Sequence, residues 1–255
     1  MTLESLGLVL STTPLGESDL VVTLLTEDHG KIAGVARGAR RSRKRFAGAL
    51  GFAVLSRFQL RPPRGELWTL EGADVVRVWS ELAADLAAFA HAGYVLDLVR
   101  VMAPAEHADA ELLALAIATF DGLTARGASA AGLRRFELAL LDGAGSAPAL
   151  AACVGCGTDD LARGATFDAA RGGVVCASCS ASGRSAGRPV AAATLTYLAA
   201  AAAADDPAAL DAATDADTRA AARDLVLGFL EHTVGHPLRS VEFLGKLNAG
   251  LRRLT

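Results

Sequence analysis

The hydrophobic period of this chain changes near residue 79, and that change limits the folds it can adopt. Before this point, apolar and polar residues alternate in short runs between turn signals such as Pro14 and Gly16, as they do in half-buried β-strands. After it, apolar residues recur at steps of three and four, as they do on one face of an amphipathic helix. The sequence therefore predicts an α+β protein with its strands first and its helices afterwards.

The N-terminal part predicts a small β-barrel. Five strand-like runs are recognisable, at residues 5–16, 20–26, 31–37, 52–60 and 66–76. Five short strands fit the OB-fold, a barrel that holds nucleic acid strands on its loops and one face. A five-stranded SH3-like barrel fits the same periodicity. We interpret residues 1–78 as an OB-fold nucleic-acid-binding domain.

The remainder predicts a helical domain with an insert. Alanine-rich stretches with flanking charges favour helix. Helical patterns cover residues 79–102, 109–125, 133–141, 191–203, 218–234 and 240–254. A segment rich in Gly and Cys interrupts them, so we divide this part into a first helical part, an insert and a second helical part: 79–149, 150–188 and 189–255.

The insert carries the strongest metal-binding pattern. Cys153 and Cys156 are followed, after 19 residues, by Cys176 and Cys179. Two CxxC pairs at this separation are typical of a four-thiolate zinc site. Free buried thiols, a redox pair and an iron–sulfur centre are the alternatives. We expect a structural Zn²⁺, because four thiolates leave no open position for catalysis and the insert has too few apolar residues to fold alone.

Positive charge is concentrated in one short segment of a chain whose formal net charge is −3. Residues 29–65 hold ten Lys or Arg and no Asp or Glu, and residues 1–80 have a net charge of +3 against −6 for 81–255. The densest part, residues 37–45, is called the basic loop below. Its charged members are Arg37, Arg40, Arg41, Arg43, Lys44 and Arg45.

The basic loop predicts contact with phosphates. Such contacts release counterions and need no sequence code. A solvated surface loop, a cluster neutralised by the acidic helical part, and an adaptor loop that meets an acidic protein are the alternatives. Phe46, Phe52, Phe58 and Trp68 could stack on bases, although barrel core is the preferred interpretation of each. We expect single strands to suit the barrel better than duplex.

No catalytic site is recognisable, so we expect a protein that is not an enzyme. His232 and His236 have helical spacing that could place both on one ion, but Pro237 ends the pattern and surface histidines are the simpler interpretation. The chain contains no Walker loop and no GxSxG motif. A nucleic-acid enzyme would need clustered acids near the basic loop. With no recognisable signal peptide or membrane span, we expect a cytoplasmic location.

Three segments in order resemble the RecO family of bacterial recombination mediators. Residues 6–46 resemble the opening of that family, with a Gly-Glu-Ser-Asp turn, a Gly-Lys hairpin and a basic loop. "LRRFELALLDGAG" at 133–145 is similar to its central helix, and "GHPLRSVEFLGKL" at 235–247 to its closing segment. The two CxxC pairs occupy an insert that some members fill with zinc.

The resemblance implies a DNA repair and recombination mediator. Such proteins bind single- and double-stranded DNA, anneal complementary strands coated with single-strand-binding protein, and help load the RecA recombinase together with RecR. The six basic-loop residues would contact phosphates. Arg134 and Arg135 would receive the C-terminal tail of the single-strand-binding protein, or serve as ordinary surface arginines. Repair would bring the protein to the nucleoid. A zinc-ribbon RNA-binding factor in translation or transcription is the alternative function.

Overall fold

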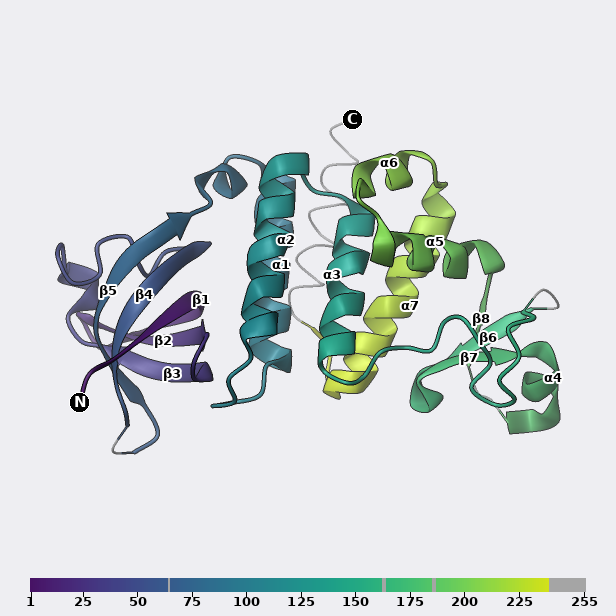
Figure 1. Cartoon of the computed structure of the whole chain (residues 1–255), viewed down its shortest axis with the longest axis horizontal. Coiled ribbons are helices and arrows are strands. Elements are labelled where there is room, and N and C mark those ends of the chain that lie inside the picture. The colour runs from purple at the N-terminus through teal and green to yellow at the C-terminus, as the bar shows by residue number, and fades with distance from the viewer. Residues whose placement is uncertain (64, 162–163, 185–186, 239–255) are drawn as a thin grey trace. The chain divides into compact units, whose positions relative to one another are not determined.

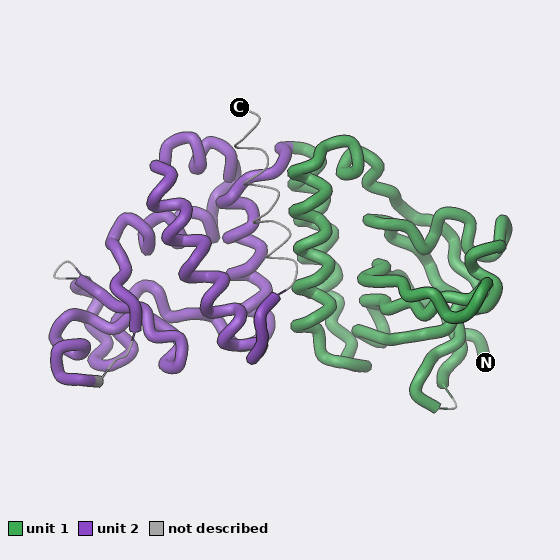
Figure 2. Tube along the Cα trace, turned by 180° about the vertical axis from the view of Figure 1, so that it is seen from behind, with its two compact units in different colours: residues 1–125, 239–255 green, residues 126–238 purple. Residues whose placement is uncertain are grey.

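The structure, a computed structural model, describes residues 1–63, 65–161, 164–184 and 187–238 (Figure 1). The described residues form two compact units, 1–125 and 126–238 (Figure 2). Each unit is a folded body with its own core. The helix expected over 240–254 lies outside the described residues. Within the described ranges, no helix is long and apolar enough to cross a bilayer.

The first unit begins with a closed barrel, as the alternating pattern predicted. Its strands run in the order β1-β2-β3-β5-β4, and β4 pairs with β1 to close the ring. Every pairing is antiparallel except that of β3 with β5. The bounds are β1 Leu3–Leu15, β2 Asp19–Thr26, β3 Gly30–Ala36, β4 Val54–Arg61 and β5 Trp68–Val78. This closed five-stranded barrel confirms the expected OB-fold.

Alternate side chains of the strands fill the barrel. Phe58 and Leu60 of β4 point inward and are fully buried, while Arg57 before them and Arg61 after them are exposed. The same period of two places Val22, Leu24, Ile32, Ala36 and Leu70 in the core. The connection from β3 to β4 contributes Phe46, which is 4% exposed. The segment that carries the basic loop therefore also helps to close the barrel core.

Two helices complete the first unit. They are α1, Leu86–Met102, and α2, Ala110–Arg126. The predicted helix from residue 79 begins later than expected, because Asp85 caps α1 by accepting a hydrogen bond from the Ala88 amide at 2.7 Å. Trp79 is instead part of the core, where its indole N–H donates to Asp121 of α2 at 2.7 Å. A short 3₁₀ helix, Ser80–Ala83, connects it to α1.

The turn between α1 and α2 packs against the start of β3. Gly30 has a φ of +62°, and a Cβ there would lie 1.9 Å from the carbonyl oxygen of His107, so only glycine fits. Glu106 donates its amide hydrogen to the Lys31 carbonyl at 2.9 Å. The Lys31 ammonium in turn donates to the Arg100 carbonyl at 2.8 Å. Burial, with the charge of Arg100, lowers the pKa of Lys31.

The second unit is a helical cluster that carries a small sheet. Its helices are α3 Ala130–Gly143, α5 Ala192–Ala203, α6 Pro207–Ala212 and α7 Ala216–Val234. Helices α3, α5 and α7 follow the predicted patterns, whereas α6 was not expected from the sequence. Asp211 at the end of α6 accepts hydrogen bonds from the Ala130 and Ala131 amides and from the Tyr197 hydroxyl. One carboxylate thus joins α6 to α3 and α5.

The cysteine-rich insert forms the small sheet. Its strands lie in the order β7-β6-β8, with bounds β6 Ala165–Asp168, β7 Gly173–Cys176 and β8 Arg188–Val190. Strands β6 and β7 form an antiparallel hairpin, and Gly172 turns the chain between them with a φ of +70°. A three-residue helix, α4 (Ala177–Cys179), follows β7. The ring of Phe167 on β6 meets Phe229 on α7 edge-on at 5.5 Å, which attaches the sheet to the helices.

Candidate nucleic-acid interface and metal centre

The basic loop is fixed to the barrel at its beginning by the turn between β1 and β2. Gly38, at a φ of +65°, donates its amide hydrogen to the Asp19 carboxylate at 2.8 Å. The Arg40 amide donates to the Ser18 carbonyl at 3.0 Å. The Gly38 amide and the Ser18 hydroxyl, with a smaller effect from Arg37, lower the pKa of Asp19 against a small rise from burial. Asp19 is therefore an anchor for the loop backbone.

The far end of the loop is fixed to β5 and to the core. The Ala73 amide donates to the Arg45 carbonyl at 2.8 Å, and the next residue, Phe46, is buried in the barrel. Between these anchors the chain forms a short 3₁₀ helix, Ala39–Arg41, without a buried residue. The loop is held at both ends, and its charged side chains lie between the anchors.

All six basic side chains of the loop are exposed, but they make different contacts. Arg40 donates to the Glu17 carbonyl at 3.2 Å, and Arg45 donates to the Arg37 carbonyl at 2.7 Å while lying 5.4 Å from the Phe46 ring centroid. These two side chains therefore help to shape the loop.

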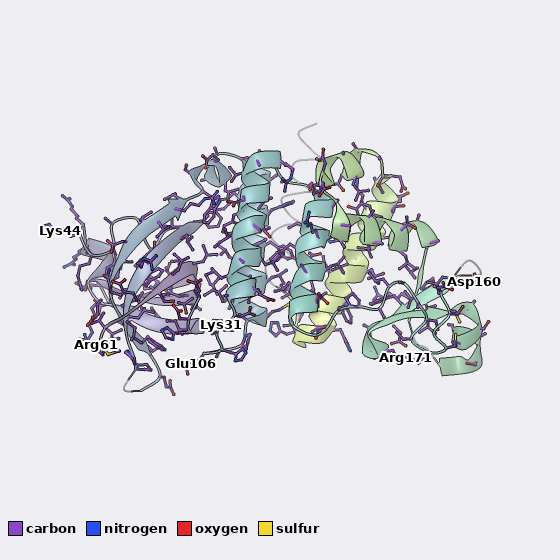
Figure 3. The ribbon with its side chains drawn as sticks, in the orientation of Figure 1. Lys31, Lys44, Arg61, Glu106, Asp160 and Arg171 are labelled. Carbon is purple, nitrogen blue, oxygen red and sulfur yellow. The ribbon has the colours of Figure 1, made fainter. Side chains whose placement is uncertain are left out.

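Arg41, Arg43 and Lys44 have their charges turned to solvent. Arg41 lies 3.6 Å from the Glu17 carboxylate, and both side chains are largely exposed, at 74% and 92%. Among the described residues, Arg43 and Lys44 have no hydrogen bond or ion pair, and Figure 3 shows Lys44 projecting away from the barrel. Sequence reasoning did not find Glu17 or Asp19 as neighbours of the loop. The tight Gly-Glu-Ser-Asp turn between two predicted strands was the available signal.

The other exposed arginines of the barrel face acidic groups. Arg61 forms an ion pair with Glu71 of β5. Arg57 on β4 pairs in register with Asp74 on β5, whose carboxylate accepts a hydrogen bond from the Gln59 amide at 2.9 Å. The outer face of β4 and β5 is therefore nearly balanced in charge, in contrast to the basic loop.

The aromatic residues considered for base stacking are mainly core residues. Phe46, Phe58 and Trp68 are 4%, 0% and 8% exposed, which confirms the core interpretation for these three. Phe52 is half-buried, with its ring centroid 4.5 Å from that of Phe89 on α1. Trp68 also lies against the His29 ring, with centroids 4.9 Å apart.

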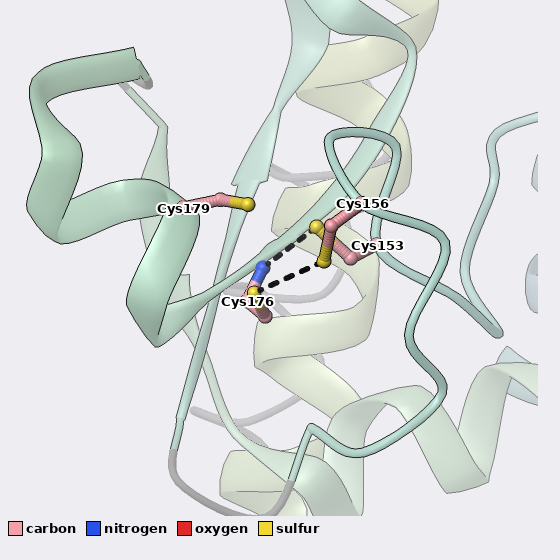
Figure 4. A group of neighbouring side chains, drawn as sticks. All are labelled: Cys153, Cys156, Cys176 and Cys179. Atoms are coloured by element: carbon pink, nitrogen blue, oxygen red, sulfur yellow. Dashed lines mark hydrogen bonds between the residues drawn. The ribbon is translucent and has the colours of Figure 1, made fainter.

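The four cysteines come together at one point of the insert, as their spacing predicted (Figure 4). Cys153 and Cys156 lie on the loop before β6, while Cys176 ends β7 and Cys179 ends α4. Their sulfur atoms all lie within 4.8 Å of one another, and those of Cys156 and Cys176 are 3.8 Å apart. The thiols are free, and the four could hold one metal ion.

The sulfur positions fit a tetrahedral ion. With metal–sulfur bonds of about 2.3 Å, the edge of a tetrahedron is about 3.8 Å, which is the Cys156–Cys176 distance. Cys153 Sγ also accepts hydrogen bonds from the Gly155 and Cys176 amides, each at 3.3 Å. Gly155 leaves room for the group, since a Cβ there would lie 3.1 Å from Cys179 Sγ. A larger residue at position 155 would crowd the sulfur atom of Cys179.

The thiols differ in acidity without a metal. The Cys176 amide, supported by that of Gly155, lowers the pKa of Cys153 to about 6. Hydrogen bonding with Cys156 and Cys176, aided by burial, raises the pKa of Cys179 to about 12. At neutral pH the group therefore offers a thiolate at Cys153 and a protonated thiol at Cys179, which a metal ion would have to deprotonate.

The two arginines predicted for partner binding lie on different faces of α3. Arg134 is 3% exposed and forms two hydrogen bonds with the fully buried Glu137, each at 2.5 Å. Arg135 is exposed, and its guanidinium donates to the Ala204 carbonyl at the end of α5 at 2.6 Å. Only Arg135 is available to a partner from the surface.

The two histidines considered as ligands of one ion, His232 and His236, do not form a shared site. His232 and His236 are both exposed, and α7 ends before Gly235, which separates them. The ring of His236 lies 3.0 Å from the Pro237 carbonyl oxygen.

Comparison with known proteins agrees with this architecture. Residues 1–79 match the family model for the N-terminal part of recombination protein O, and residues 83–242 match its C-terminal model. A DNA repair protein RecO from Anaeromyxobacter sp. (strain K) is 40% identical over 248 residues, covering 94% of this chain and 95% of that protein. The RecO of Myxococcus xanthus (strain DK1622) is 37% identical over 243 residues, covering 94% and 96%.

The barrel with its basic loop, and the helical unit with its four-cysteine group, define a class of two-unit proteins with an N-terminal OB-fold. The matches cover nearly the whole chain. The chain belongs to the RecO family of DNA repair proteins.

Proposed function

We propose that this protein is a recombination mediator that binds single- and double-stranded DNA and anneals complementary strands coated with single-strand-binding protein. It then helps to load RecA together with RecR. The observation that carries the proposal is the basic loop, whose ends are anchored to the barrel while Arg43 and Lys44 have no partner among the described residues. Anchored cations contact phosphates at a smaller entropic cost than a free segment would.

Annealing follows from charge neutralisation. Two DNA strands repel each other through their phosphates, and the basic loop reduces that repulsion while complementary bases find each other. No bond is made or broken, so no catalytic residue is needed. Binding to the tail of the coating protein raises the local concentration of strand around the loop, and linked weak contacts then act as one stronger contact. We assign the exposed Arg135 to that tail.

Arg134 has a different role in this proposal. Its buried pair with Glu137 keeps α3 in place and does not meet the partner directly. Removing one member of such a pair would leave an uncompensated buried charge, at a cost of about 3–5 kcal/mol. We propose that Zn²⁺ occupies the four-cysteine group as a structural ion. The protein would act at the nucleoid during repair.

The double variant Arg43→Gln/Lys44→Gln tests the basic loop. We expect weaker DNA binding and a salt dependence that is flatter by about 1.4 for single strands and about 1.8 for duplex, because two phosphate contacts are lost. Arg57→Gln, an exposed arginine that faces Asp74 on the balanced side of the barrel, is the matched control. Fluorescence anisotropy over a salt series measures both quantities. An unchanged affinity and slope in the double variant would reject the basic loop as the binding site.

The annealing rate of complementary strands coated with single-strand-binding protein tests the mediator activity. We expect acceleration by the protein without ATP, and little acceleration by the double variant. Tight binding to RNA in preference to single-stranded DNA, without acceleration, would favour an RNA-binding factor, since the 2′-hydroxyl distinguishes the two.

A further inference from the structure

On β1, β2 and β3, the outer face of the barrel beside the basic loop is made of small, uncharged side chains. Strand pairing places Thr13, Val21, Val35 and Thr69 in one row across β1, β2, β3 and β5, and the row ends on β4 at Arg61, which forms an ion pair with Glu71. The next row holds Ser11, Thr23 and Ala33. Val35 lies two residues before Arg37, so the first row borders the loop. This is the face on which an OB-fold usually receives bases.

Aromatic side chains do not reach this face in the described part of the chain. Ten of the twelve Phe, Trp and Tyr residues in the described ranges are buried. The other two, Phe52 and Phe89, lie against each other at 4.5 Å. Proteins that hold single strands by their bases do so on aromatic rings, and each stacked base adds about fivefold to more than a hundredfold in affinity. The barrel therefore combines uncompensated cations with a face that cannot stack bases.

We propose that this protein holds nucleic acid through its phosphates alone and leaves the bases free. The inference rests on the proposed function and deepens it, because it makes the phosphodiester chain itself the substrate. A base stacked on an aromatic ring would have to leave that ring before it could pair, which would slow annealing. A strand held only along its backbone presents its bases to a complementary strand at once. Base stacking then contributes nothing to a preference for single strands over duplex.

The test compares an ordinary single-stranded oligonucleotide with an abasic one of equal length, on the full-length protein. We expect the two affinities to agree within about twofold at each salt concentration, because both carry the same phosphates. An abasic strand that binds more than about tenfold more weakly would overturn the proposal and leave DNA binding intact. If neither strand binds, the proposed function fails as well, so the two failures are distinguishable.

A variant that adds a stacking ring gives a second, independent readout. Val21→Trp places an aromatic residue in the row that borders the basic loop, and strands accept aromatic residues well. We expect several-fold tighter binding of the ordinary strand, unchanged binding of the abasic strand, and slower annealing. Tighter binding of the ordinary strand without slower annealing would overturn the proposal, because stacked bases would then not hinder pairing.

Discussion

Two acidic residues in the same turn contact the basic loop in different ways. Asp19 accepts the Gly38 amide and keeps a lowered pKa, so its contribution to loop docking is present above the unfolded-state pKa of about 3.9 and is lost as the pH falls through the lower folded-state value. Glu17 is 92% exposed, and its carboxylate contacts only the Arg41 guanidinium among the described residues. One acid therefore supports the loop, and the other competes with phosphate for one of its cations.

Replacing Glu17 by Gln should strengthen DNA binding. An exposed ion pair is worth about 0–1 kcal/mol, so we expect affinity to rise by up to about fivefold as Arg41 becomes available to a phosphate. Binding measured by anisotropy checks this value. Glu4→Gln, on an exposed position of β1 away from the loop, controls for the general loss of negative charge. The gain should disappear in an Arg41→Gln background, and a gain that persists there would contradict the pairing.

At the scale of elements, the insert depends on its four cysteines more than on its core. Its apolar cluster is small, with Val175 fully buried beside Cys153 and Cys176 and only a few partly buried neighbours. Its three strands have only three or four residues each, which is the short end of the usual range for strands. An ion bound by both CxxC pairs would join the loop before β6 to the segment after β7. It would thereby stabilise the insert, whose own core is too small.

Substituting Cys153 by Ser should abolish metal binding and unfold the insert. Zinc contributes about 10–16 kcal/mol to the folding of small finger peptides, so a three-ligand site would not retain the native structure of the module. Metal content, and amide hydrogen exchange of β6 and β7, measure the two effects. Cys153→Ser protein with one equivalent of metal and wild-type protection would reject the four-thiolate site. The barrel, in the other compact unit, is expected to keep its exchange protection.

Metal binding by the wild-type insert should depend on pH. Because the pKa of Cys179 is about 12 without metal, its proton must leave when an ion binds at neutral pH. Apparent affinity should therefore rise as the pH increases from 6 to 8, with proton release visible by calorimetry in buffers of different ionisation enthalpy. Binding that is independent of pH over this range would show that the thiol is not a ligand.

At the scale of the whole molecule, opposite charges are distributed to different parts of the chain. Residues 1–80 have a net charge of +3 and residues 81–255 of −6. The basic loop lies in the first compact unit and α3, with Arg135, lies in the second. DNA contact and partner contact are thus assigned to different units, and they can be separated by substitution.

The substitution Arg135→Glu should separate the two contacts. We expect it to reduce the annealing rate of coated strands severalfold while leaving the affinity for bare DNA unchanged, because it removes the cation that we assign to the tail of the single-strand-binding protein. Arg126→Glu, at an exposed position at the end of α2, is the control for added negative charge. Equal annealing rates of coated strands with wild type and Arg135→Glu would remove α3 from the proposed partner surface.

Much of this protein follows from its sequence alone. Local periodicity is sufficient for the barrel strands and for most helices, since side chains in strands and helices face the core at fixed intervals. The paired CxxC spacing predicted the cysteine group, because the two cysteines of each CxxC pair are close in sequence and their sulfur atoms come together through local structure alone. The cluster of basic residues at 37–45 could also be recognised from the sequence, because its members lie within nine consecutive positions.

The tertiary structure decided which of these residues are available. Arg134 and Arg135 are neighbours in sequence, yet the packing of α3 buries the first beside Glu137 and exposes the second. The basic loop, which has no acidic residue of its own, lies beside two, Glu17 and Asp19, because the antiparallel pairing of β2 with β3 brings the β1–β2 turn next to it. These outcomes depend on contacts between residues distant in sequence, which periodicity and spacing do not encode.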